Sequence, residues 1–219
     1  IKTLVGFQFR FHPVLQQIKT ILDTRALGRL YTFRIHWGEY LPGWHPWEDY
    51  SQSYAARREL GGGVVNTLCH PLDYTRWLFG EVHSLSAVTS KVSALELDVE
   101  DAAEITVILE SGALGSIHLD YLQRPPAHWL SVNCEKGHIH WNNETGCAKI
   151  YHAGDQRWEY LDPPDGFERN TLFLDEMHHF LNLIVGEVVS RCSLADGIMA
   201  LKLTEAVHES NRTHQQIFF

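Results

Sequence analysis

One segment, residues 59–80, concentrates the residue types and spacings that could do chemistry. Three glycines stand near its start, and an asparagine, a histidine, an aspartate and a tryptophan follow them. If the residues after the glycines are helical, these four lie at i, i+4, i+7 and i+11, and therefore on one face. They are Asn66, His70, Asp73 and Trp77. The row therefore predicts a functional site that includes His70.

The structural alternative is that His70 caps or bridges a helix and Asp73 is a solvated neighbour. Two features favour a site instead. The row is too polar for a core stripe, and consecutive glycines let the backbone approach a ligand or another backbone closely. Residues 38–58 also form a long loop rich in proline, glycine, tryptophan and tyrosine. An unpatterned loop of that length is more often functional than a simple connector.

Hydrophobic periodicity predicts the strands that must position this segment. Alternation in residues 114–122 indicates a strand with one buried face, and Ser111-Gly112 indicates the hairpin turn before it. The other expected strands are 1–11, 30–37, 82–92, 102–110, 129–134, 138–141, 148–152 and 157–161. Short connections predict an α+β fold, with an open, predominantly antiparallel sheet covered by helices on one face. We expect residues 1–219 to form a single domain.

Four helices are expected to cover the sheet. Pro13 opens the first, and a short helix runs from the glycines to Gly80. The third spans about 171–185 and stops at Gly186, and Ser193 caps the last. The side chains of the last helix that we expect to face inward are Leu194, Ile198, Leu201 and Leu203.

Composition narrows the class of protein. With 219 residues, 44% hydrophobic and 21% charged, the chain can bury a substantial core. Its formal charge of −9, without a basic stripe, disfavours nucleic acid as a partner. The four cysteines form no CxxC pair and are interpreted as reduced thiols. No apolar run is long enough to span a bilayer and no signal peptide opens the chain, so we expect a cytoplasmic protein without a membrane partner.

Motifs along nearly the whole chain stand in a characteristic order. They are VGFQFRFHP at 5–13, HPWEDYSQSYAARREL at 45–60, the glycine run that leads to WLFG at 77–80, DAAEITVILESGALGSIHLDYLQRP at 101–125, FLDEMHHFLNLIVGE at 173–187 and ADGIMALKLTEAVHES at 195–210. In this order and spacing the chain resembles the C-terminal half of the glucose–fructose oxidoreductase, inositol dehydrogenase and MocA (Gfo/Idh/MocA) family. His70 occupies the family's histidine position, and Asp73 matches the acidic residue that usually follows it.

The resemblance implies a substrate-binding and dimerisation domain with a dihydrodipicolinate-reductase-like C-terminal fold. It implies hydride transfer between NAD or NADP and a carbon bearing a hydroxyl or carbonyl, with His70 taking or giving the hydroxyl proton. The substrate would be a sugar, polyol or nucleotide-sugar. The exposed sheet face would form a homodimer or homotetramer. Expected substrate contacts are Trp44, His45, Trp47 and Tyr54, with Arg10 or Arg57 available for a carboxylate or phosphate.

The chain departs from the family pattern in two ways. Asn66 stands where the family usually has an aspartate, and an amide cannot serve as an anion or base. A shift by one residue would place Thr67 there, which leaves Asp73 as the nearest carboxylate able to orient His70. No GxGxxG follows a strand, and the family's Glu-Lys-Pro lysine would lie upstream of residue 1. We therefore expect the dinucleotide-binding domain to be absent from this chain, and the isolated chain to be inactive.

Two alternatives from other classes remain. His138, His140 and Glu144 have the spacing of a cupin-like metal site, although alternating strand residues beside a surface glutamate explain them more simply. We therefore assign no metal ligands. The substitution at Asn66 and the missing cofactor half also allow a non-catalytic dimerisation or ligand-sensing domain of the same family.

Overall fold

Nine strands form one continuous sheet in the computed structural model, which describes residues 1–219. They are β1 Leu30–Gly38, β2 Val82–Ser90, β3 Ala102–Leu109, β4 Leu114–Asp120, β5 Ala127–Cys134, β6 Gly137–Asn142, β7 Ala148–His152, β8 Arg157–Leu161 and β9 Ile217–Phe218. The spatial order is β8-β7-β6-β5-β1-β4-β3-β2-β9. Only β1 and β4 are parallel neighbours, so the predicted α+β fold with a predominantly antiparallel open sheet is confirmed.

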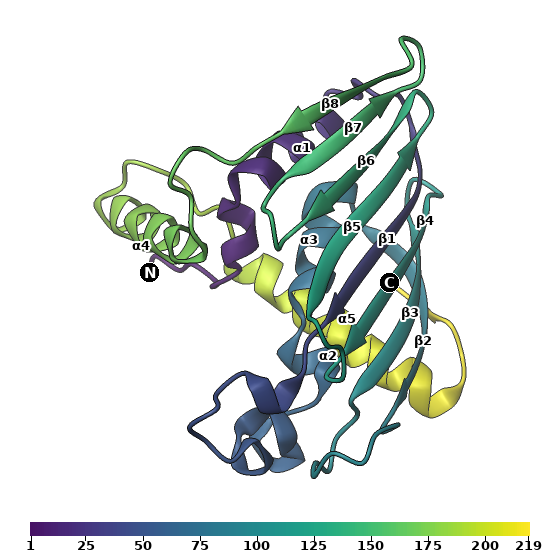
Figure 1. The fold of residues 1–219 in the computed structure, drawn as a ribbon, viewed down its shortest axis with the longest axis vertical. Helices are drawn as coiled ribbons and strands as arrows, with labels where there is room; N and C mark the ends of the chain where they lie inside the picture. Colours follow the sequence, from purple (N-terminus) through teal and green to yellow (C-terminus); the bar gives the residue numbers. More distant parts are fainter.

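Helices cover one face of the sheet and leave the other, here called the open face, uncovered (Figure 1). The helices are α1 Pro13–Asp23, α2 Val64–Thr67, α3 His70–Phe79, α4 Arg169–Val185 and α5 Leu194–Thr213. Short 3-10 turns are η1 Gln8–Phe11, η2 Leu41–Gly43, η3 Tyr50–Gln52, η4 Tyr54–Ala56 and η5 Arg58–Leu60. Four of these turns belong to the aromatic loop, residues 38–58, and its continuation to the glycines. In Figure 1, α4 projects away from the sheet, while α5 runs behind it.

Side-chain alternation along each strand produces the two faces of the sheet. In β4, Ile117 and Leu119 are fully buried beneath the helices, whereas Ser116 and His118 face the open side. Burying one aliphatic side chain of this size stabilises the fold by about 1.5–3 kcal/mol. One large hydrophobic core therefore lies between the covered face and the helices, while the open face carries polar and aromatic side chains.

The expected strand at residues 1–11 is wrong. Residues 1–7 have no regular structure, and Gln8–Phe11 form η1, whose four residues are all buried. The Phe-Gln-Phe-Arg-Phe alternation resembles a strand, but the segment finds no partner strand and packs instead among α1, α3 and α4. The chain turns here because His12 caps α1: its Nδ1 accepts from the backbone N–H groups of Val14 and Leu15 at 3.2 and 3.4 Å.

The single helix expected after the glycines is two helices. α2 ends at Thr67, Leu68 leaves the helical region with φ −98° and ψ 39°, and α3 begins at His70. Pro71 explains the break, because it has no N–H to donate to the Thr67 carbonyl and its ring crowds the preceding turn. Asn66 and His70 consequently do not share a helix face.

The predicted end of α4 at Gly186 and the predicted cap of α5 at Ser193 are both correct, although α4 begins at Arg169, two residues earlier than expected. Gly186 ends α4 with φ 86°, and Ser193 forms a capping box with Asp196 at the start of α5. The expected inward face of α5 is correct only for Leu203; Leu194, Ile198 and Leu201 are exposed. α5 packs on β2 through small residues, and Ser210 accepts the Ala87 N–H at 2.9 Å. None of the helices is both long and apolar enough to cross a membrane.

Candidate functional site

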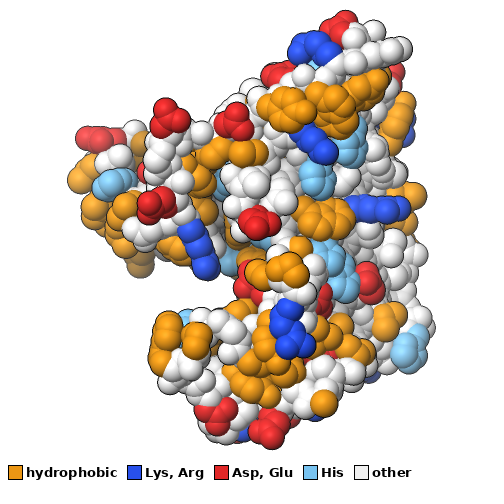
Figure 2. Space-filling view, in the orientation of Figure 1, with side chains coloured by type: hydrophobic (Ala, Val, Ile, Leu, Met, Phe, Trp, Pro, Cys, Tyr) orange, Lys and Arg blue, Asp and Glu red, His pale blue; other side chains and the backbone are white.

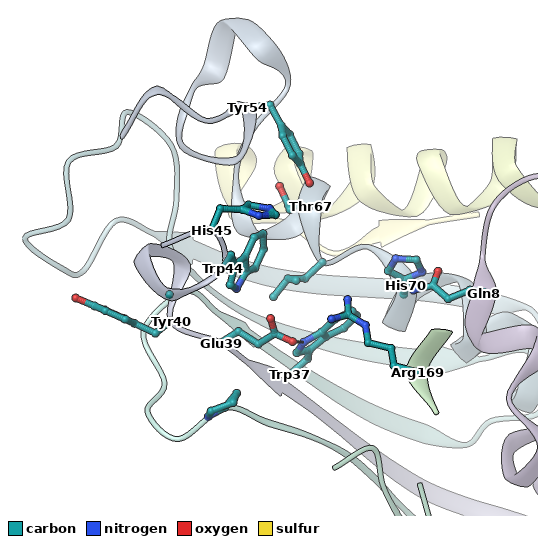
Figure 3. A pocket seen from close by; sticks show the side chains of 13 residues that line it. Gln8, Trp37, Glu39, Tyr40, Trp44, His45, Tyr54, Thr67, His70 and Arg169 are labelled. Atoms are coloured by element: carbon teal, nitrogen blue, oxygen red, sulfur yellow. Dashed lines mark hydrogen bonds between the residues drawn. The ribbon is translucent and has the colours of Figure 1, made fainter. Parts of the chain in front are cut away.

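A cavity of about 610 Å³ opens where β1 ends and the aromatic loop begins. Its walls come from η1, β1, the aromatic loop, the α2–α3 segment and the start of α4. The lining residues are Gln8, Trp37, Glu39, Tyr40, Gly43, Trp44, His45, Tyr54, Thr67, Leu68, His70, Pro126 and Arg169. Figure 3 shows His70, Gln8 and Arg169 grouped on one side of this space, opposite Trp44, His45 and Tyr54. The cavity therefore joins a polar group to an aromatic wall.

His70 reaches this cavity from the first residue of α3. Its ring meets Phe7 and Phe9 edge-on, with centroids 5.4 and 5.5 Å apart. Burial, reinforced by the positive charge of Arg169, lowers the pKa of His70 to about 4. Nδ1 is buried and has no hydrogen-bond partner in the protein. At neutral pH the imidazole is therefore uncharged, and it can accept a proton from a hydroxyl group in the cavity.

A rigid stack of rings holds the wall beside His70. The Trp37 ring is parallel to the buried His128 ring, with centroids 4.2 Å apart, and His128 Nε2 hydrogen-bonds to the Tyr74 hydroxyl at 3.0 Å. Trp37 Nε1 donates to Glu39 Oε1 at 2.7 Å. This bond fixes the carboxylate at the cavity wall, where it can accept hydrogen bonds from a ligand.

The opposite wall is built by the glycines and the aromatic loop. A Cβ at Gly62 would collide with the Tyr54 carbonyl oxygen, and Gly63 has φ 111°. The Gly63 N–H donates to the Ala55 carbonyl at 3.0 Å. The glycines therefore allow the close approach of another backbone segment, which places Tyr54 over the cavity. Trp44 completes this wall, and its buried Nε1 has no partner in the protein.

Arg10 and Asp73 lie outside the cavity and form an ion pair with each other. Arg10 Nε and Nη2 donate to the two Asp73 carboxylate oxygens at 3.0 and 2.7 Å, and both side chains are buried. Arg10 Nη1 also donates to the Arg191 carbonyl at 2.8 Å. The expectation that Asp73 orients His70 is therefore wrong, and Arg10 is not free to hold a substrate anion. The pair instead ties η1 to α3.

Asn66 also points away from the cavity. Its Nδ2 donates to the carbonyls of Gly61 and Gly62 at 3.2 and 3.0 Å, and its Oδ1 lies 3.2 Å from His208 Nε2. An amide suits this place because it has N–H groups to donate to the carbonyls, which an ionised carboxylate lacks. The neighbouring Thr67 lines the cavity in its stead.

Of the other residues expected to bind a ligand, some line the cavity and others do not. Trp44, His45 and Tyr54 line the cavity, whereas Trp47 is 77% exposed and meets only the His45 ring among the aromatic contacts. Arg57 contributes its backbone carbonyl to the glycine turn, and its side chain is not in the lining. His138, His140 and Glu144 do not assemble as a ligand set; the one such group of three is His36, His118 and Asp120 on the open face.

Sequence reasoning missed several lining residues, and only some of them carried a local signal. Trp37 and Glu39 stand where an alternating strand runs into the aromatic loop, a junction that could have been singled out. Gln8 and Arg169 had no such signal, because their place in the cavity depends on η1 and α4 folding back over the sheet end.

The fold and site define a class of protein: an α+β domain with an open sheet and a polar, aromatic-walled cavity at the end of that sheet. The chain belongs to the Gfo/Idh/MocA family: the model of the GFO/IDH/MocA C-terminal domain matches residues 15–140.

Named relatives extend this similarity. An uncharacterized oxidoreductase of Synechocystis sp. is 27% identical over 80% of this chain and 52% of its own. The rhizopine catabolism protein MocA of Rhizobium meliloti is 25% identical over 94% of this chain and 58% of its own. D-apiose dehydrogenase of Paraburkholderia graminis is 30% identical over 57% of this chain and 31% of its own. The chain thus spans little more than half the length of the first two relatives.

Among solved structures, levoglucosan dehydrogenase in complex with NADH and levoglucosan has the same fold. It aligns with a TM-score of 0.89 over 100% of this chain and 66% of that chain, at 21% identity.

Proposed function

We propose that this chain is the substrate-binding part of an NAD- or NADP-dependent oxidoreductase that acts on a sugar, polyol or nucleotide-sugar. The observation that carries the proposal is an uncharged His70, with an unpartnered buried Nδ1, in a cavity lined by Glu39 and Arg169. Relatives named for D-apiose and levoglucosan support a sugar-type substrate.

The cavity residues fit a ligand with several hydroxyl groups. Glu39 accepts hydrogen bonds, and Arg169 and the Trp44 indole donate them. Trp44 and Tyr54 supply flat apolar surface for the carbon skeleton. An unpartnered buried donor or acceptor destabilises the protein by about 1–3 kcal/mol, and two of the cavity-lining residues, His70 and Trp44, each carry one.

His70 then acts as the general base for alcohol oxidation. With a pKa of about 4, the imidazole is unprotonated at neutral pH and accepts the hydroxyl proton as the carbonyl forms. A bound nicotinamide would supply the hydride acceptor. Reduction of the carbonyl returns the same proton from His70 or through it from water.

The dinucleotide is held by a further domain in this proposal, because no Gly-rich phosphate motif follows a strand here. The α4 apolar face is a place for that domain to pack. It comprises the exposed side chains Phe173, Leu174, Met177, Leu181 and Ile184. Figure 2 shows hydrophobic side chains gathered on the projecting α4. Without that domain the chain binds substrate but has no turnover. The open face is the proposed surface for a homodimer or homotetramer.

Replacement of His70 in the full-length protein tests the catalytic proposal. We expect His70→Ala to lower kcat by about 10²–10⁴-fold with NAD and a panel of sugars and polyols, because a general base contributes that much. The matched control is His138→Gln, a histidine on the open face that does not line the cavity, and it should keep wild-type turnover. Full activity in His70→Ala would sink the mechanism.

A non-catalytic, ligand-sensing domain is the second candidate. It is favoured by Asn66, which replaces the family aspartate and points away from the cavity. Calorimetric titration with the same sugar panel separates the two candidates. Sugar binding to a full-length protein that shows no NAD- or NADP-dependent turnover would establish sensing.

A further inference from the structure

We propose that His36, His118, Asp120 and Gln123 form a binding site for one divalent transition-metal ion of the zinc type on the open face. The site lies outside the substrate cavity and does not depend on the proposed oxidoreductase activity. Sequence reasoning did not single it out, because its members come from two strands that are distant in the chain.

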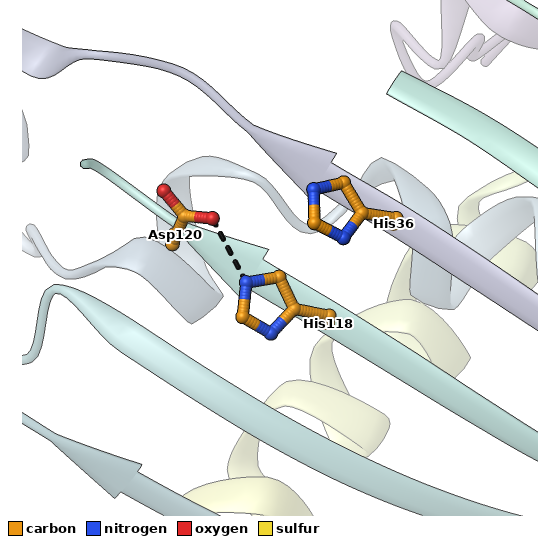
Figure 4. A group of neighbouring side chains, drawn as sticks. All are labelled: His36, His118 and Asp120. Atoms are coloured by element: carbon orange, nitrogen blue, oxygen red, sulfur yellow. Dashed lines mark hydrogen bonds and ion pairs between the residues drawn. The ribbon is translucent and has the colours of Figure 1, made fainter. Parts of the chain in front are cut away.

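Strand register brings the ligands together. β1 and β4 are parallel, and His36 is paired directly with His118, so both imidazoles project from the open face. Asp120 lies two residues beyond His118 on the same face. Ligand atoms of the three residues lie within 4.8 Å of one another, and Figure 4 shows both rings and the carboxylate turned toward one region. Ligands bonded to zinc at about 2.0–2.2 Å stand roughly 3.4 Å apart, so small side-chain rotations complete the geometry.

Gly38 allows two side-chain oxygens to approach the imidazoles. Gly38 is the residue of β1 paired with Asp120. A Cβ at Gly38 would collide with both Asp120 Oδ2 and Gln123 Oε1. The absence of a side chain here lets these two oxygens converge beside the imidazoles. Gln123 Oε1 already lies 2.5 Å from His36 Nε2 and is placed to serve as the fourth ligand.

Surrounding groups hold the ligands in orientation. His118 Nδ1 lies 2.6 Å from Glu104 Oε1, which leaves Nε2 facing Asp120 Oδ2 at 2.8 Å. A carboxylate on the far nitrogen is the usual support of a metal-bound histidine. The other Asp120 oxygen, Oδ1, accepts the backbone N–H groups of Leu122 and Gln123 at 2.7 and 2.8 Å. Oδ2 is thereby aimed at the imidazoles.

Ring stacking and charge complete the case. The His36 ring lies between His118, with centroids 4.7 Å apart, and Trp129, with centroids 5.3 Å apart and planes within 2°. The stacked His36 and His118 rings have planes 13° apart, so a ring rotation must turn their Nε2 lone pairs toward one ion. Glu104 and Asp120 together carry two negative charges, which a divalent ion neutralises. Two imidazoles and two oxygens match the borderline ligand preference of zinc better than that of magnesium or calcium.

Zinc titration of the full-length protein tests the site. The protein is purified without a histidine tag, stripped with a chelator, and titrated in competition with a chromophoric chelator. We expect one equivalent of zinc to bind. His36→Gln should weaken binding by roughly a hundredfold, and Glu104→Gln should weaken it by about 10–100-fold through the orientation of His118. Asp120→Asn keeps the backbone hydrogen bonds of Oδ1, so it should fold and still lose affinity.

The matched control is His138→Gln, which removes another open-face histidine and should leave the affinity unchanged. Cobalt(II) in place of zinc should give a tetrahedral visible spectrum that is lost in His36→Gln. No stoichiometric zinc in the wild type, or equal affinity in His36→Gln, Asp120→Asn and the wild type, would overturn the proposal. Zinc binding in His70→Ala should equal that of the wild type, so failure of either proposal leaves the other measurable.

Discussion

At the scale of single residues, the Asp73 carboxylate illustrates how a plausible catalytic group becomes a structural one. It stands three residues after His70, yet both of its oxygens accept hydrogen bonds from the buried Arg10 guanidinium. A bidentate pair of this kind is strong because donors and acceptors match in geometry. Its removal would leave the buried Arg10 guanidinium with only the longer ion pair to Asp196, at 3.4 Å.

Asp73→Asn tests this structural role. We expect it to lower the free energy of unfolding by about 3 kcal/mol, because the buried Arg10 loses its two-bond partner and keeps only the longer contact with Asp196. Asp23→Asn breaks the exposed pair with Lys19 and should change the free energy of unfolding by less than about 1 kcal/mol. Urea denaturation at pH 7.5 measures both. A stable Asp73→Asn variant that has lost turnover would show instead that the carboxylate is catalytic.

At the scale of elements, His12 couples the start of α1 to pH. Burial lowers the pKa of His12 to about 4 from the 6.5 of an exposed histidine. Its Nδ1 must also stay unprotonated to accept the two N–H groups of the helix cap. Between pH about 6.5 and about 4 the unfolded chain therefore binds a proton that the native chain does not. The stabilisation is fully present above pH 6.5 and is lost as the pH falls through this window.

Urea denaturation at pH 7.5 and pH 5 checks this dependence. Wild-type stability should fall at pH 5, and His12→Ala should be less stable than the wild type by about 1 kcal/mol or more at pH 7.5, because it loses the cap. The gap between the two proteins should narrow at pH 5. His178→Ala, at an exposed residue of α4, should follow the wild type at both pH values. A gap of the same size at both pH values would contradict the role of His12.

At the scale of the whole molecule, the α4 apolar face is the most unusual surface. α4 projects from the sheet with Met177, Leu181 and Ile184 more than half exposed, although burying each such side chain is favourable (Figures 1 and 2). The relatives are longer than this chain, and we propose that the cofactor domain packs against this face of α4.

Leu181→Glu in the full-length protein tests whether the cofactor domain packs against the α4 apolar face. The charge should weaken packing against the cofactor domain, so proteolysis between the two parts should become faster and the affinity for NAD or NADP should fall. The control is Val92→Glu, at another exposed apolar residue, on the loop after β2, and it should behave like the wild type. Unchanged proteolysis and cofactor affinity in Leu181→Glu would remove α4 as the packing surface.

Much of the fold could be predicted because its signals are local. Alternation placed β1 to β8 within a few residues, and Pro13, Gly186 and Ser193 marked helix ends correctly. The segment 1–11 failed because period-2 alternation does not reveal whether a partner strand exists. The helix after the glycines failed because a proline one residue inside α3 interrupts a pattern that otherwise continues.

The candidate site, like the fold, was predictable only where its signals are local in the sequence. The sequence by itself determined the covered face of the sheet and the family, and it identified His70 as a candidate site residue, since residue type and spacing along one chain suffice for them. The tertiary structure decided which side chains meet. It paired Asp73 with Arg10, brought Gln8 and Arg169 to the cavity, and set His36 beside His118 through the register of β1 and β4. Such contacts depend on how elements cross and align, which no local pattern of residues encodes.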